Sequence, residues 1–116
     1  MASRSLQYAK RIESLDEHEE HPGQTLATRN HEVIKRWAEE RGAKPAAVPG
    51  TEHDGHLGVL RFDFPGYGGQ ELKHVSWDEW FKTFDARNLT FIYQEHTKDG
   101  KESNFFQLDN PDREDG

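Results

Sequence analysis

The sequence contains no cysteine. Disulfide bonds, thiolate catalysis and cysteine-ligated zinc sites are therefore excluded. Hydrophobic residues make up only 32% of the chain, and no apolar run approaches the roughly 20 residues that a membrane-spanning helix needs. The first residues also lack the apolar core of a secretory signal. We therefore expect a cytoplasmic protein that does not enter a membrane.

Positive charge is also scarce, because the formal net charge at pH 7 is -7. A protein that binds nucleic acid through its phosphates needs a clustered basic face. The densest basic region holds Lys35, Arg36, Arg41 and Lys44, but glutamates are interleaved with these residues. Their spacing is typical of ion pairs on a helix surface. The pattern disfavours nucleic acid as a partner and leaves a nucleic-acid-associated regulator as the second alternative function.

The apolar residues are concentrated in the middle of the chain. We predict a single α+β domain over residues 28–109, an N-terminal arm over residues 1–27 and a disordered tail over residues 110–116. In the arm, apolar residues recur every three positions from Leu6 to Leu15. That pattern is compatible with a marginal helix and also with a flexible segment.

Two helices are predicted from their capping residues. The first begins at Asn30, a good N-cap, and ends at Gly42, which can adopt the left-handed conformation of a helix stop. The second begins with a capping box formed by Ser76 and Glu79, and Asn88 is a plausible stop.

The second helix carries four large aromatic residues, Trp77, Trp80, Phe81 and Phe84. Their positions i, i+3, i+4 and i+7 place them in one stripe along the helix. We interpret this stripe as core rather than as a ligand cradle. Trp77, at the start of the helix, is the expected exception, with part of its ring exposed.

A hairpin is predicted near the end of the chain. Asp99-Gly100 favours a two-residue type I′ turn, and counting outward from such a turn fixes the register. The hairpin then presents one apolar face. In this register Tyr93 faces Phe106, Phe91 faces Leu108, and Leu89 extends the same face.

Two more strands are predicted at residues 45–48 and 57–64, so the order of elements is α-β-β-α-β-β. The fold class that satisfies this order is α+β. We expect two helices packed on one face of a four-stranded, mainly antiparallel sheet.

One short stretch suggests metal binding. His53, Asp54 and His56 lie in a glycine-containing turn, and imidazole and carboxylate groups suit zinc, nickel or iron. The turn supplies two histidines at most, whereas a zinc site needs three or four converging ligands. A polar turn without a metal is the competing interpretation.

Other polar groups offer weaker indications of catalysis. Ser76 next to His74 and Ser103 opposite His96 are possible nucleophile and base pairs. The hydroxyl of Ser76 is already expected to cap a helix, and Ser103 is expected near an exposed turn. The glycine-rich stretch PGYGGQ lacks the lysine and hydroxyl residue of a phosphate-binding loop.

Several segments together resemble a family of small, uncharacterised bacterial proteins. They are HEVIKRWAEERGAKPAAVPGT, GVLRFDFPGY, VSWDEWFKTFDARNLTFIYQE and ESNFFQL, and the resemblance covers about residues 28–108. Some members carry the label "1,4-alpha-glucan branching enzyme", an activity whose barrel and carboxylate set do not fit in a chain this short. The resemblance implies no catalytic residues. Its recurring positions here are Trp37, Ala38, Gly42, Phe62, Trp80, Phe81 and Tyr93.

We therefore predict a non-enzymatic protein-binding or accessory module of the bacterial cytoplasm, with no cofactor. Its predicted binding surface is the hairpin face opposite the core, formed by Ile92, Gln94, Phe105 and Gln107. The expected partner is another protein, and the chain itself is expected to be a monomer or a weak homodimer. The first alternative is a metal-binding protein or a small metal-dependent enzyme that uses the His53–His56 turn.

Overall fold

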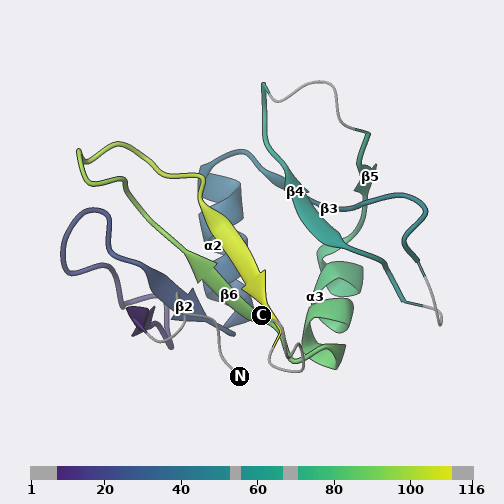
Figure 1. The fold of residues 1–116 in the computed structure, drawn as a ribbon, viewed down its shortest axis with the longest axis horizontal. Coiled ribbons are helices and arrows are strands. Elements are labelled where there is room, and N and C mark those ends of the chain that lie inside the picture. The colour runs from purple at the N-terminus through teal and green to yellow at the C-terminus, as the bar shows by residue number, and fades with distance from the viewer. Residues whose placement is uncertain (1–7, 53–55, 67–70, 111–116) are drawn as a thin grey trace. The chain divides into compact units, whose positions relative to one another are not determined.

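The computed structural model describes residues 8–52, 56–66 and 71–110 (Figure 1). Helices and strands alternate irregularly along these ranges, so the predicted α+β class is confirmed. The elements are β1 (Lys10–Arg11), β2 (Leu26–Thr28), α2 (His31–Glu40), β3 (Lys44–Ala47), β4 (Leu60–Asp63), β5 (Lys73–His74), α3 (Trp77–Ala86), β6 (Thr90–Tyr93) and β7 (Phe106–Asp109).

The described strands form two sheets, where the sequence predicted one. β1, β2, β6 and β7 make a four-stranded sheet in that order, and β4, β3 and β5 make a three-stranded sheet. The predicted single sheet joined the hairpin to the strands in the middle of the chain. It is wrong because the hairpin pairs with β2 instead, while β3 pairs with β4 and with β5.

The chain divides into two compact units. The first takes in the residues up to Ile34 and those from Asn88 onward, and therefore contains the four-stranded sheet. The second is Lys35–Arg87, which contains the three-stranded sheet and α3. We predicted a single domain over residues 28–109. The structure instead divides these residues between two units, and the first boundary between the units lies within α2, after Ile34.

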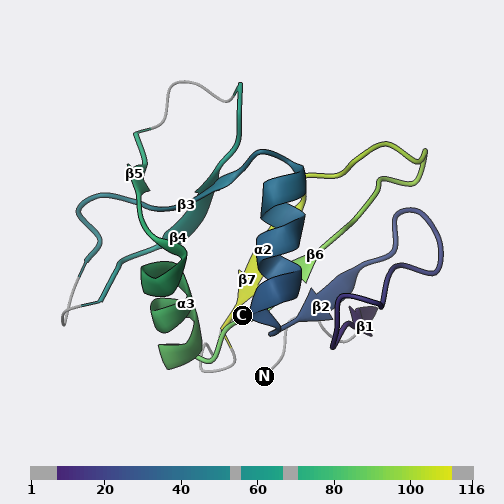
Figure 2. The same cartoon turned by 180° about the vertical axis from the view of Figure 1, so that it is seen from behind.

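Part of the predicted N-terminal arm belongs to the sheet and the core of the first unit. β2 lies between β1, with which it pairs in parallel, and β6, with which it pairs antiparallel (Figure 2). The side chains of Ile12, Leu26 and Ala27 are buried. A flexible or marginally helical arm is therefore the wrong description of these residues. The strands are too short to display the alternation that reveals a strand in a sequence. Residues 1–7 and the predicted tail after Asn110 lie outside the described residues.

The predicted register of the hairpin strands is confirmed. Tyr93 pairs with Phe106 and Phe91 pairs with Leu108. Phe91 and Tyr93 are buried, and their rings stack with centroids 5.2 Å apart. β6 therefore lies at the centre of its sheet, between β2 and β7, and is buried along its whole length.

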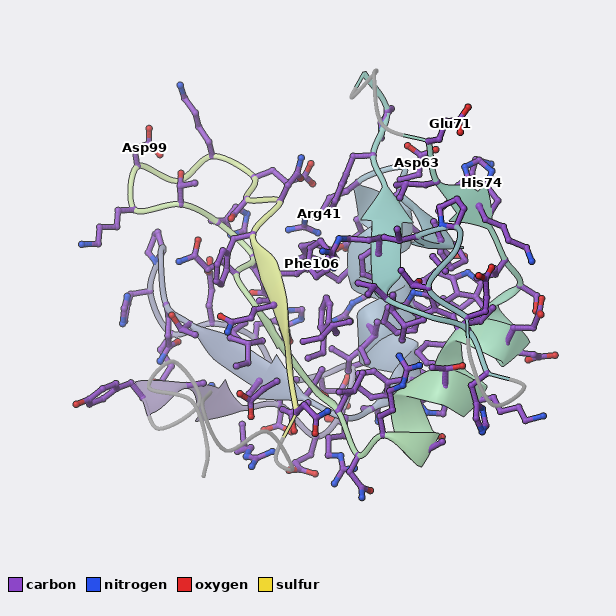
Figure 3. The ribbon with its side chains drawn as sticks, turned by 45° about the vertical axis from the view of Figure 1, so that its right-hand side comes forward. Arg41, Asp63, Glu71, His74, Asp99 and Phe106 are labelled. Carbon is purple, nitrogen blue, oxygen red and sulfur yellow. The ribbon has the colours of Figure 1, made fainter. Side chains whose placement is uncertain are left out.

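The hairpin turn has a different form from the predicted one. The Thr97 N–H donates to the Lys101 carbonyl at 2.7 Å, and the Gly100 N–H donates to the Thr97 carbonyl at 2.9 Å. The loop therefore contains three residues, with Gly100 at φ = 88°, the left-handed conformation that such a loop requires. The Thr97 hydroxyl also donates to Asp99 at the exposed tip, which lowers the pKa of that carboxyl group (Figure 3).

Both predicted helices are confirmed, together with their caps. Asn30 Oδ1 accepts from the Val33 N–H at 3.1 Å at the start of α2, and Gly42 beyond its end has φ = 68°. At the start of α3, Ser76 Oγ accepts from the Glu79 N–H at 3.1 Å, which completes the predicted capping box. Local sequence signals are sufficient to position both helices.

The aromatic stripe of α3 forms the core of the second unit. Trp80, Phe81 and Phe84 are buried. The ring of Trp80 stacks on Phe62 of β4, with centroids 4.9 Å apart, and its indole N–H donates to the Arg61 carbonyl at 3.1 Å. The interpretation of the stripe as core is confirmed for these residues.

Candidate functional site

Trp77 is the one aromatic residue of the stripe in α3 that remains partly exposed, as predicted. It borders an open groove of about 650 Å³ on the second unit. Binding sites for small ligands have volumes of roughly 300–1,000 Å³, so the groove falls in that range. Its lining residues come from the stretch between the end of α2 and the start of β3, and from the stretch between the end of β5 and the start of α3: Glu39, Gly42, Ala43, Lys44, Pro45, His74, Val75, Ser76 and Trp77.

The indole of Trp77 is held in place by other aromatic rings. It stacks on Phe81 with centroids 5.2 Å apart, and it lies 5.9 Å from Phe62 and 6.0 Å from Trp80. These contacts fix the ring before any ligand arrives, which reduces the entropy lost on binding. Among the described residues, the indole N–H of Trp77 has no hydrogen-bond partner, so it is available as a donor.

The groove has an apolar floor and a charged rim. Ala43 and Pro45 are buried beneath it, and the Val75 N–H donates to the Pro45 carbonyl at 3.1 Å, which joins its two sides. Glu39 and Lys44 are exposed and carry opposite charges. Such a surface can accept an apolar side chain at its centre and polar groups at its edges.

A histidine–carboxylate pair lies beside the groove. His74 Nε2 is 2.6 Å from Asp63 Oδ2, and the two side chains point toward each other (Figure 3). They are 54% and 37% exposed, so water is not excluded from them. Ser76, the predicted partner of His74 in catalysis, is engaged in the helix cap with Glu79. The arrangement therefore does not assemble a nucleophile with its base.

The second predicted nucleophile pair is not opposed across the hairpin as predicted. His96 pairs with Glu102, and the Ser103 N–H donates to the Glu95 carbonyl, because the three-residue turn shifts this part of the hairpin by one position. The hydroxyl of Ser103 donates to Gln94 Oε1 at 3.0 Å. An extra residue in the returning strand restores the predicted register before β7 begins.

The predicted binding surface on the hairpin is not a continuous exposed face. Ile92 has 0% exposure and pairs with Ala27 of β2, which the prediction had placed in the arm. Gln94 is partly buried, and its amide donates to the Gly23 carbonyl at 3.3 Å. Of the predicted set, only Phe105, at 43%, and Gln107 are exposed.

Two further regions singled out in the sequence are the predicted metal turn and the basic region of the first helix. His53 and Asp54 of the predicted metal turn lie outside the described residues, while His56 is exposed. In the basic region of the first helix, Arg41 is buried. Its guanidinium lies 4.4 Å from the centre of the Trp37 ring and donates to the Trp37 carbonyl at 2.9 Å. Arg41 is therefore not presented to a phosphate backbone.

No protein-family model matches the chain, and no curated protein or solved structure matches it either. The resemblance to the family of small bacterial proteins therefore stays a prediction. Among the described residues, no helix has the length and apolar character needed to cross a membrane. The groove at Trp77 joins a cavity to a partly exposed aromatic side chain.

Proposed function

We propose that this chain is a non-enzymatic protein-binding module that accepts a short segment of a partner protein in the Trp77 groove. The observation that carries the proposal is the position of Trp77, which is partly exposed, fixed by three aromatic rings and placed at the side of a groove. Rigid, partly exposed aromatic side chains are typical anchors of protein interfaces.

The neighbouring strand supports a peptide as the occupant. Among the described strands, β5 is an outer strand of the three-stranded sheet, and its His74 also lines the groove. An extended segment can add to the edge of such a sheet through main-chain hydrogen bonds while one of its side chains enters an adjacent pocket. The charges of Glu39 and Lys44 favour a segment with polar residues on both sides of an apolar one.

A selection from a random peptide library against the full chain tests this proposal. The selected peptides are then measured by titration calorimetry against the wild type and against Trp77→Ala. Loss of an interface anchor costs at least about 2 kcal/mol, so we expect the Kd to rise roughly 30-fold or more. Phe105→Ala is the matched control, because it removes an exposed aromatic side chain from the other unit, and we expect it to leave the Kd within about twofold.

A second variant separates lost binding from lost folding. Lys44→Glu changes an exposed side chain at the rim, and we expect it to weaken the same peptides while the circular dichroism spectrum stays unchanged. Selected peptides that bind Trp77→Ala and Lys44→Glu as tightly as the wild type would show that the groove is not the binding site. A selection that yields no binding peptide would also count against the proposal.

A further inference from the structure

Two histidine–glutamate dipeptides from distant parts of the chain meet in the first unit. His18-Glu19 lies in the loop between β1 and β2, and Glu95-His96 lies in the hairpin between β6 and β7 (Figure 1 and Figure 2). His18 Nδ1 is 2.9 Å from Glu95 Oε2, and His96 Nδ1 is 2.6 Å from Glu19 Oε2. The Glu19 N–H also donates to Glu95 Oε1 at 3.0 Å. We call these four residues the His–Glu cluster.

The two carboxylates of the His–Glu cluster are mostly buried. The side chain of Glu19 is 13% exposed and that of Glu95 is 16% exposed. The Oε1 atom of Glu19 is buried and has no hydrogen-bond partner among the described residues. A buried carboxylate oxygen without a donor is costly, and a cation would compensate for it. An isolated ion pair on the protein surface can form without burying its carboxylate, so the burial of these two carboxylates is not needed for the ion pairs alone.

The loop is also held against the hairpin by contacts outside the cluster. The Gly23 N–H donates to the His96 carbonyl at 2.9 Å, and the Gln94 amide donates to the Gly23 carbonyl at 3.3 Å. A Cβ at Gly23 would lie 2.7 Å from Lys98 Cγ, so the two segments approach closely here. These contacts hold the cluster together before an ion binds, which lowers the entropy cost of binding.

The ligand atoms are close enough to converge on one ion. One such atom from each of Glu19, Glu95 and His96 lies within 4.8 Å of the others. Bonds of roughly 2.0–2.2 Å to a tetrahedral zinc ion place ligand atoms about 3.4 Å apart, so small rotations of the side chains suffice. Imidazole with carboxylates is a ligand set that zinc and related divalent transition metals accept.

We propose that the His–Glu cluster is a binding site for a divalent transition-metal ion such as zinc. Glu19, Glu95 and His96 are its ligands, and His18 orients the Glu95 carboxylate from outside the coordination sphere. On binding, the ion takes the place of the proton between His96 Nδ1 and Glu19 Oε2. The Nδ1 proton leaves to solvent while Nε2 takes one up, so the imidazole ligand stays neutral. The bound ion joins the loop between β1 and β2 to the hairpin.

Zinc titration of the full chain by calorimetry tests this site. We expect one saturable site that holds about one ion per chain. Glu19→Gln keeps the size of the side chain but weakens ligation, so the Kd should rise more than about 100-fold, above the range of an outer-shell change. His18→Ala, an outer-shell change, should raise the Kd by about 10-fold.

Three further variants identify the site. His96→Asn is a second ligand variant, and we expect it to raise the Kd for zinc as much as Glu19→Gln does. We expect at least one of these two variants to keep the circular dichroism spectrum of the metal-free wild type. His74→Ala removes the exposed histidine of the other histidine–carboxylate pair and should leave the Kd unchanged. The proposal is overturned if zinc binds both ligand variants as tightly as the wild type. It is also overturned if the double variant His53→Ala/His56→Ala abolishes binding.

Discussion

Replacement of Trp80 by alanine is expected to lower the free energy of unfolding by about 3–5 kcal/mol, the range for a fully buried large aromatic side chain. Trp80 has 0% exposure, and its ring stacks on Phe62 and on Phe84, with centroids 4.9 Å and 5.5 Å away. The substitution also removes the donor to the Arg61 carbonyl. Urea unfolding followed by far-ultraviolet circular dichroism measures this loss as a lower midpoint.

Trp77→Ala is the matched control for this stability measurement. Trp77 is one turn earlier on α3 and partly exposed, so its loss should cost less than about 2 kcal/mol. Equal losses at Trp77 and Trp80 would contradict the division of the stripe into a buried core and one residue that faces a groove.

Replacement of Ile92 by alanine is expected to lower the free energy of unfolding by about 2–5 kcal/mol. Ile92 lies at the centre of the four-stranded sheet, between Ala27 of β2 and Gln107 of β7, and has 0% exposure. The same substitution at Phe105, which is 43% exposed, should cost less than about 1 kcal/mol. Thermal and urea unfolding of the two variants side by side provide the comparison.

The result for Ile92 decides between two descriptions of the hairpin. If Ile92→Ala were as stable as the wild type, the face would be open, as the sequence predicted. A large loss at Ile92 with little loss at Phe105 is the result expected when Ile92 lies in the core of the first unit and Phe105 on its surface.

Both helices could be predicted from the sequence because their signals are local. Asn30 and Ser76 cap helix ends by bonding to amides three residues away, and such contacts leave a recognisable spacing in the sequence. The aromatic stripe of α3 is equally local, since i, i+3 and i+4 are neighbours on a helix. The pairing of β6 with β7 was predictable in part because the two strands are adjacent in the chain.

The partners of the sheets could not be predicted in the same way. β2 is three residues long and pairs with a strand more than sixty positions later, so its own sequence carries no signal that identifies β6 as its partner. Because β2 was not recognised, residues 1–27 were interpreted as an arm. The three-residue turn was missed because Asp99-Gly100 is compatible with both loop lengths.

The Trp77 groove and the His–Glu cluster could not be predicted from the sequence either, because each is formed by segments that are distant in the chain. The groove depends on the pairing of β3 with the two-residue strand β5, which brings Lys44 and Pro45 near Val75 and Trp77. Only the partial exposure of Trp77 was visible in the sequence, from its place at the start of the helix. For the His–Glu cluster, the available signal was the mirrored order of the two dipeptides, His18-Glu19 and Glu95-His96, whose side chains contact each other in the structure.

The central claim is that Trp77 is the anchor of a peptide-binding groove, and one titration tests it most directly. A peptide selected against the full chain is added to the nitrogen-15-labelled protein, and amide and indole signals are followed by nuclear magnetic resonance. We predict saturable shifts of the Trp77 indole signal and of the Lys44 and Val75 amides. A peptide that binds while these signals stay in place, and that instead shifts the amides of Phe105 and Gln107, would contradict the claim.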